Sequence, residues 1–116
     1  MSSVMTLAAS GTQTTTGNSV GVPTPAGENI IVQVITSAAS GTTPSATFFL
    51  QWSLDGINYA ASDPAVSFTA VTATGSASKV TPVLGSFVRL AWTISGTTPS
   101  FTFKALAFVT GARSDS

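Results

Sequence analysis

Apolar and polar side chains alternate along much of the chain with a period of two, which places every second residue on the same face of a β-strand. The alternation is clearest over residues 87–94 and 101–109, and it recurs over 47–54 with Phe48, Leu50, Trp52 and Leu54 on one face. Residues 30–35 are nearly all β-branched, which favours a strand buried on both faces. Residues 66–71 are a further candidate strand. No window has the spacing of an amphipathic helix, so the pattern predicts an all-β chain.

A repeated hexapeptide interrupts these strands. Ser-Gly-Thr-Thr-Pro-Ser occupies residues 40–45 and again residues 95–100, each time between two apolar runs. Because glycine permits unusual backbone angles and proline ends strand pairing, both copies are interpreted as hairpin loops, within hairpins 30–54 and 86–109. Asp55-Gly56 is a third turn signal, since this dipeptide between apolar runs is typical of a tight hairpin.

The elements predict a single antiparallel β-sandwich, jelly-roll-like, of about seven to eight strands over residues 28–112. Residues 1–27 are rich in Ser, Thr, Gly and Pro and carry few apolar side chains. They are predicted to be an extended N-terminal arm that orders on a neighbouring subunit or partner, with a frayed terminus as the alternative. Residues 113–116 are predicted to be a short polar tail.

The composition excludes several functions. Only 7% of the 116 residues are charged and the formal net charge is +0, whereas about 25% is ordinary. With no Cys and no His, the chain has no Cys/His zinc site, no disulfide and no His-activated nucleophile. Four basic residues are too few for a nucleic-acid-binding face. No apolar run approaches the ~20 residues of a membrane-spanning helix, and the start lacks the basic region of a signal peptide.

Few side chains are candidates for chemistry. Asp55 and Asp63 could approach across a turn, but each fits a structural role, Asp55 in the Asp-Gly turn and Asp63 before a proline. A calcium site of Asp55, Asn58 and Asp63 is the alternative, because Ca²⁺ binds carboxylate and amide oxygens. Trp52 is in phase with an apolar strand face and Trp92 with another, which favours core positions over sugar-stacking ones. Tyr59, near a turn, is the better candidate for an exposed aromatic. We therefore predict no enzyme, and no catalytic, cofactor-binding or metal-binding residues.

Two stretches resemble a known group of proteins. Residues 49–59 (FLQWSLDGINY) and 82–92 (PVLGSFVRLAW) are similar to parts of the small β-sandwich proteins of tailed phages, in particular capsid decoration (cement or auxiliary) proteins. The similarity covers about residues 28 to 110 and lies in pattern, size and composition. It implies a structural virion protein that binds the major capsid protein on the outside of the shell after synthesis in the host cytoplasm, and a homo-oligomer, with a trimer expected.

The expected partner contacts follow from the arm and one basic residue. The few side chains able to anchor the arm, and an arginine that could form an ion pair between subunits, are Val4, Met5, Leu7, Val20, Val22 and Arg89. No cofactor, nucleic acid or membrane is expected as a partner. The alternative function is a β-sandwich module on a tail or spike that binds a glycan or host surface, which requires exposed aromatic side chains.

Overall fold

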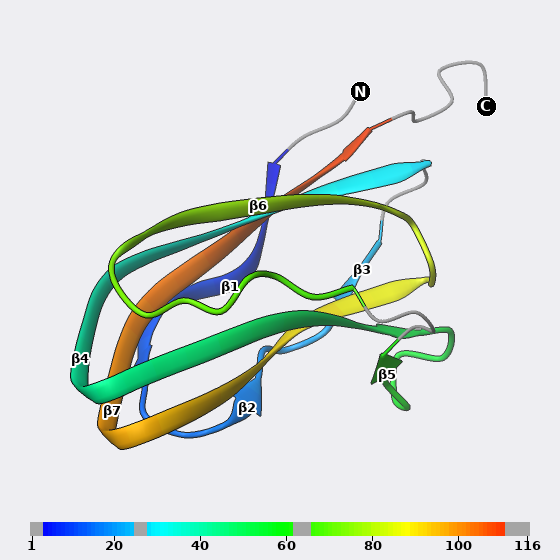
Figure 1. The fold of residues 1–116 in the computed structure, drawn as a ribbon. Helices are drawn as coiled ribbons and strands as arrows, with labels where there is room; N and C mark the ends of the chain where they lie inside the picture. The colour runs from blue at the N-terminus through cyan, green and yellow to red at the C-terminus, as the bar shows by residue number, and fades with distance from the viewer. Residues whose placement is uncertain (1–3, 25–27, 62–65, 111–116) are drawn as a thin grey trace.

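The computed structural model describes residues 4–24, 28–61 and 66–110, and these residues contain strands but no helix (Figure 1). They form one antiparallel sheet. Its strands are β1 (Val4–Gln13), β2 (Gly17–Asn18), β3 (Val22–Pro23), β4 (Asn29–Ser53), β5 (Ala60–Ala61), β6 (Gly75–Pro82) and β7 (Phe87–Thr110). The predicted all-β fold is confirmed.

Two strands of unusual length, β4 and β7, are the frame of the molecule. They pair with each other from Asn29 opposite Thr110 to Ser53 opposite Phe87. The sequence predicted two separate hairpins, 30–54 and 86–109, and this is wrong because the two halves of each segment do not pair with each other. Instead β4 and β7 bend together, and their two-stranded ribbon folds over on itself (Figure 1).

Folding of the ribbon creates two facing layers. The upper layer in Figure 1 contains residues 29–40 and 100–110, flanked by β1 and β6, and the lower layer contains residues 45–53 and 87–95, flanked by β2, β3 and β5. Aromatic rings join the layers. The Phe103 ring of the upper layer meets those of Phe48 and Trp92 of the lower layer edge-on, with centroids 4.8 and 5.0 Å apart. The result is a sandwich-like fold made from a single sheet.

The repeated hexapeptide forms the bend in both strands. Ser40 pairs with Ser100, Thr42 with Thr97, and Ser45 with Ser95, so the two copies lie against each other rather than closing separate loops. The prediction that they are hairpin loops is therefore wrong. Their backbones nevertheless need the freedom that the sequence indicated, with φ of 117° at Gly41 and 119° at Gly96.

Each repeat has no side chain at its glycine, and the backbone of the other repeat lies close to that position. A Cβ added to Gly41 would lie 2.8 Å from the Thr98 carbonyl oxygen, and one added to Gly96 would lie 2.7 Å from the Thr43 carbonyl oxygen. Thr43 and Thr98 also have matching positive φ values of 47° and 46°. The bend thus has an approximate twofold symmetry, which explains why the same six residues occur twice.

The core lies between the layers and follows the predicted alternation. Its fully buried large side chains are Phe48, Phe101, Ile30, Leu50, Leu90, Val32, Val34 and Val88. Trp52 and Trp92 are buried as predicted. Two details differ. The strand at 30–35 is fully buried on one face only, since Gln33 is exposed on the other, and Leu54 is 79% exposed because β4 ends at Ser53.

The described part of the predicted arm belongs to the sheet. β1, β2 and β3 all pair with β7 of their own chain, and Leu7 is only 2% exposed within the core. The segment is extended, as predicted, but it is neither a separate arm nor a frayed terminus. The remaining residues 1–3 and 25–27, and the predicted tail 113–116, lie outside the described residues.

The candidate strand at 66–71 lies beside the lower half of β4 as an irregular extended segment. Its backbone is hydrogen-bonded to β4 at both ends: Val71 and Ala46 exchange bonds of 2.7 and 2.9 Å, and the Leu50 N–H donates to the Val66 carbonyl at 3.0 Å. Val66 and Phe68 are buried against the core. This segment closes one edge of the lower layer.

We expect that Gly41→Ala or Gly96→Ala lowers the free energy of unfolding by at least about 1–3 kcal/mol, the cost of a residue held in a disfavoured backbone region. The added methyl group would also overlap a carbonyl oxygen of the other repeat. Gly11→Ala is the control, because the nearest atom to its Cβ lies 3.9 Å away. Denaturant unfolding measures the difference, and equal stabilities of all three variants would contradict this account of the bend.

Leu7→Ala tests whether β1 is integral to the fold. Loss of a buried leucine is expected to lower the free energy of unfolding by roughly 2–5 kcal/mol. Val20→Ala, at a side chain that is 84% exposed, should change it by less than about 0.5 kcal/mol. Thermal or denaturant unfolding distinguishes the two, and a Leu7→Ala protein as stable as the parent would show that β1 is dispensable.

Candidate functional site at the Asp55 loop

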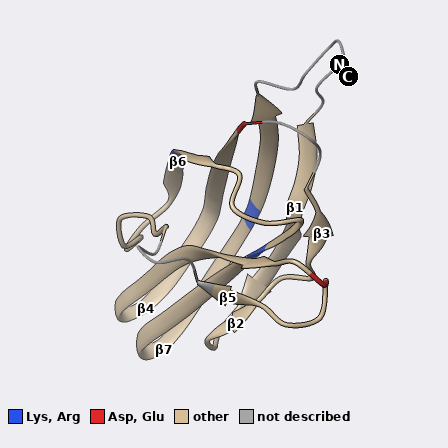
Figure 2. Cartoon of the chain, turned by 90° about the vertical axis from the view of Figure 1, so that its right-hand side faces the viewer, with Lys and Arg blue, Asp and Glu red and all other residues tan. Residues whose placement is uncertain are grey.

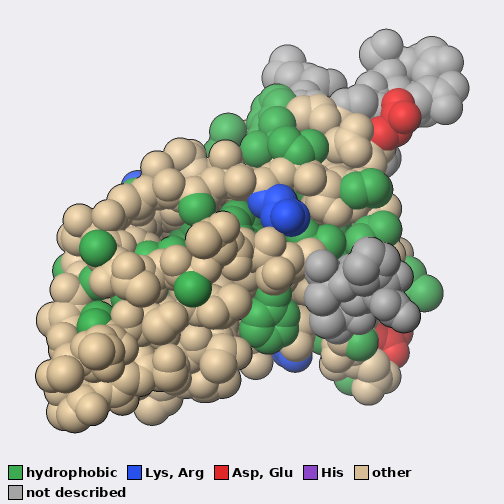
Figure 3. All heavy atoms as spheres, in the orientation of Figure 1, with side chains coloured by type: hydrophobic (Ala, Val, Ile, Leu, Met, Phe, Trp, Pro, Cys, Tyr) green, Lys and Arg blue, Asp and Glu red, His purple; other side chains and the backbone are tan. Residues whose placement is uncertain are grey.

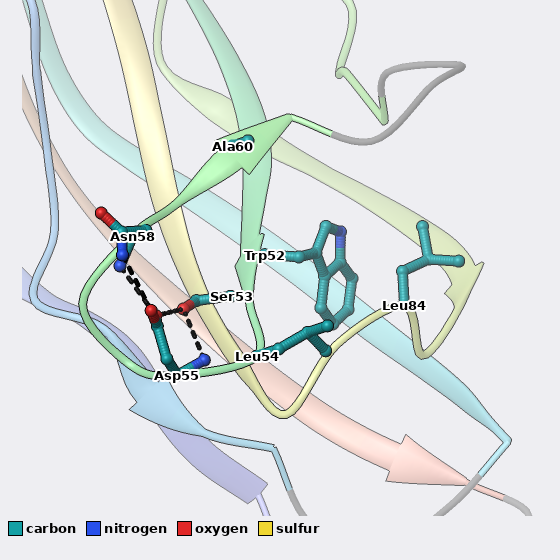
Figure 4. Close-up of a pocket in the computed structure, with 7 residues that line it drawn as sticks. All are labelled: Trp52, Ser53, Leu54, Asp55, Asn58, Ala60 and Leu84. Carbon is teal, nitrogen blue, oxygen red and sulfur yellow. Dashed lines mark hydrogen bonds between the residues drawn. The ribbon is translucent and has the colours of Figure 1, made fainter.

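The loop that follows β4 is held by one carboxylate. Asp55 Oδ1 accepts a hydrogen bond from the backbone N–H of Asn58 at 2.8 Å, and Asp55 Oδ2 accepts one from Asn58 Nδ2 at 2.8 Å (Figure 4). Asp55 Oδ1 also accepts the backbone N–H of Ile57 at 2.9 Å. The loop lies at the far end of the sandwich from the bend (Figure 1). The chain reverses at Asp55-Gly56 as predicted, but the hairpin is not a tight one, because Trp52 of β4 pairs with Ala60 of β5.

Ser53 completes the network. Its hydroxyl donates to Asp55 Oδ1 at 2.8 Å and accepts the backbone N–H of Gly56 at 2.8 Å. Gly56 has a φ of 77°, a conformation that favours glycine. These hydrogen bonds fix the backbone of residues 53–58 without burying apolar side chains in the loop itself.

The hydrogen bonds also set the charge of the loop. Donation by the backbone N–H groups of Asn58 and Ile57, together with the Asn58 and Ser53 side chains, holds the pKa of Asp55 far below its ordinary value. Both carboxylate oxygens are used within the loop, which leaves Asp55 poorly placed for the calcium hypothesis. Asp63 lies outside the described residues. Among the residues that are described, no group of three His, Cys, Asp or Glu side chains could hold a metal ion.

Apolar side chains project around this fixed loop. Leu54 and Ile57 are 79% and 80% exposed, and Leu84, on the connection between β6 and β7, is 45% exposed. We call these three residues the apolar tip. Leu54 and Leu84 lie on either side of the Trp52 indole, which is 6% exposed (Figure 4). Together with Ser53, Asp55, Asn58 and Ala60 they line an open hollow of about 380 Å³.

The tryptophan and tyrosine side chains already have partners within the chain. Trp92 is buried and its Nε1–H donates to the Thr15 carbonyl at 3.1 Å, while Trp52 is covered by the core and the tip. The Arg89 guanidinium carbon lies 4.5 Å from the centre of the Tyr59 ring, over one face. A Cβ at Gly21 would overlap the Tyr59 hydroxyl. Both tryptophans are therefore core residues, and Tyr59 is half-buried with Arg89 over one ring face.

The six predicted partner-binding residues do not form one site. Leu7 is in the core, and Met5 and Val22 are half-buried against it, so these three anchor the chain to itself. Only Val4 and Val20 are largely exposed.

Arg89 is half-buried and held within its own chain. Its Nε–H donates to Gln51 Oε1 at 2.6 Å, on the same outer face of the lower layer as Tyr59.

The apolar tip was not predicted from the sequence. The signal was present, because the Asp-Gly turn is directly flanked by Leu54 and Ile57, and large aliphatic side chains in a tight turn have no core to enter. Leu84 is a similar case, because it is a large aliphatic residue that follows Val83 in the short connection between β6 and β7.

The remaining surface is mostly polar but uncharged. The described charged residues, Glu28, Asp55, Lys79, Arg89 and Lys104, occur singly on strands and loops (Figure 2). The face in Figure 3 is largely tan, with hydroxyl side chains and backbone between scattered apolar groups. Such a surface has weak long-range electrostatics, so recognition of a partner depends on apolar contact and hydrogen bonding.

No family model matches the chain, and a search of curated proteins finds no match. Within residues 4–24, 28–61 and 66–110 there is no helix long and apolar enough to cross a membrane.

Asp55 is expected to make stability depend on acidity. Its pKa is lower in the folded protein than the ordinary value of 3.8, so the unfolded chain binds the proton more readily. The stabilisation is therefore fully present above about pH 4 and is lost as the pH falls through the folded-state pKa. Denaturant unfolding between neutral pH and about pH 2 should show this decline. In Asp55→Asn the decline should be smaller, and an unchanged pH profile would contradict the assigned role.

Proposed function

We propose that this chain is a non-enzymatic structural virion protein that binds the outer surface of a phage capsid and stabilises the shell. The observation that carries the proposal is the apolar tip, where Leu54 and Ile57 are held exposed by the Asp55 hydrogen bonds. Exposed aliphatic side chains on a fixed backbone are suited to burial against another protein. The resemblance of residues 49–59 to capsid decoration proteins falls on the same loop.

The tip is suited to binding in energetic terms. Full burial of a Leu or Ile side chain is worth about 1.5–3 kcal/mol. A loop already fixed by hydrogen bonds loses little conformational entropy when it docks. Many copies bound to one shell would together contribute many such modest contacts, because a regular shell presents the same surface many times.

The low charge supports the same role. Charged side chains lose hydration when an interface covers them, and this loss is often not recovered. Among the described residues of the Asp55 loop and the β6–β7 connection, Asp55 is the one charged side chain, and its carboxylate is already hydrogen-bonded. Docking of the Asp55 loop against the major capsid protein therefore requires little desolvation of charge.

Binding to shells tests the proposal. Leu54→Ser together with Ile57→Ser should weaken co-sedimentation with phage shells that lack their decoration protein by roughly tenfold or more, from lost apolar burial. Both side chains are about 80% exposed, so the thermal stability should hardly change. The control is Thr97→Ser, an exposed position at the bend, which should bind as the parent does.

Two results would contradict the proposal. The parent chain could fail to co-sediment with any such shell, or the tip variant could bind as tightly as the parent and the Thr97→Ser control.

A further inference from the structure

The four edges of the folded sheet differ in how well they are closed. In the lower layer, residues 17–23 run along β7, and β5 with residues 66–71 runs along β4. These short or irregular segments leave no long strand edge. The upper layer ends in two longer strands, β6 on one side and β1 on the other. An unpaired strand edge is a template for pairing with another chain.

The β6 edge carries features that oppose pairing. Lys79 is exposed in the middle of β6, and the strand begins at Gly75 and ends at Pro82. Lysine and proline are the residues that natural proteins place on edges to prevent association. If two copies met through β6, their lysines would approach each other.

The β1 edge has neither of these residues, although two register shifts interrupt it. Its ten residues, Val4–Gln13, contain no charged residue and no proline, and among the described residues β1 pairs with β7 alone. On the outer face, β1 also begins an apolar row that crosses the upper layer. The row runs from strand to strand through Val4, Phe108, Ile31 and Val80, which are paired in register.

We propose that β1 is a self-association edge, which pairs antiparallel with β1 of a second copy about a twofold axis. A second copy supplies an uncharged, unpaired edge of equal length, and its pairing brings no like charges together. The charge pattern thus favours β1 and opposes β6 as the contact between copies.

The irregularities of β1 locate the axis. Register shifts between Thr6 and Ala8 and between Ala8 and Gly11 leave two regular stretches, 4–6 and 11–13. In a twofold antiparallel pair these two stretches lie opposite each other when the axis passes between Ala8 and Ala9. Because the other edges are closed or charged, the association stops at a dimer instead of forming a fibre. This differs from the trimer expected from the sequence.

Charge substitutions on the two edges test the proposal. In a sedimentation experiment at about 100 μM, the parent chain should have twice its monomer mass of 11.6 kDa, because a dimer with a micromolar Kd is almost fully formed at that concentration. Thr6→Lys with Ser10→Lys, both exposed on β1, should give the monomer mass. Ser76→Lys with Ser78→Lys, exposed on β6, adds the same charge and should leave the dimer intact. Circular dichroism shows whether each variant is folded.

Cysteine cross-linking gives a second readout that does not require the lysine variant to fold. The chain has no Cys, so single variants are clean probes. Under mild oxidation, Ala9→Cys, next to the axis, should form a covalent dimer, whereas Thr12→Cys, which lies far from its symmetry mate, and Ser78→Cys on β6 should form none. A parent chain that is monomeric or trimeric, a dimer that survives the β1 lysines, or cross-linking strongest at Ser78→Cys would each overturn the proposal.

Discussion

The mutual fit of the two Ser-Gly-Thr-Thr-Pro-Ser segments is the constraint on which the fold depends. Two paired strands can turn back over themselves only if both turn at the same place, because otherwise one strand would lose its partner. Gly41 and Gly96 meet this condition, since each faces a backbone carbonyl of the opposite repeat. The bend then sets which half of β4 faces which half of β7. The packing of Phe103 on Phe48 and Trp92 is a result of that choice.

Strands were predictable from the sequence where one face is buried, but their partners were not. The period-two pattern identifies residues 87–94 and 101–109 as strands because it reflects contact with a core. It carries no information on whether an intervening Gly-Thr-Thr-Pro reverses the chain or only bends it. That outcome is decided by the other repeat, about 55 residues away, which local propensity cannot include.

The N-terminal segment shows a different limit. Its average composition argued against a place in the core, yet the burial of Leu7 and Ala8, together with backbone pairing to β7, places it in the sheet. At the candidate site, the Asp-Gly turn was correctly predicted because its chemistry is local. The exposure of Leu54 was not, because β4 ends one residue before it and the alternating pattern therefore no longer applies.

The pairing of β4 with β7 has a consequence for how the chain folds. Asn29 lies opposite Thr110, so the central ladder joins residues that are far apart in sequence, and the molecule has a high contact order. Chains of this kind fold slowly, because the entropy of closing long loops is lost before the contacts form. Until then β4, which has no charged residue, and β7, which has only Arg89 and Lys104, are unpaired. Newly made chains at high concentration therefore compete between intramolecular pairing and aggregation, and the expression rate should affect the yield of folded protein.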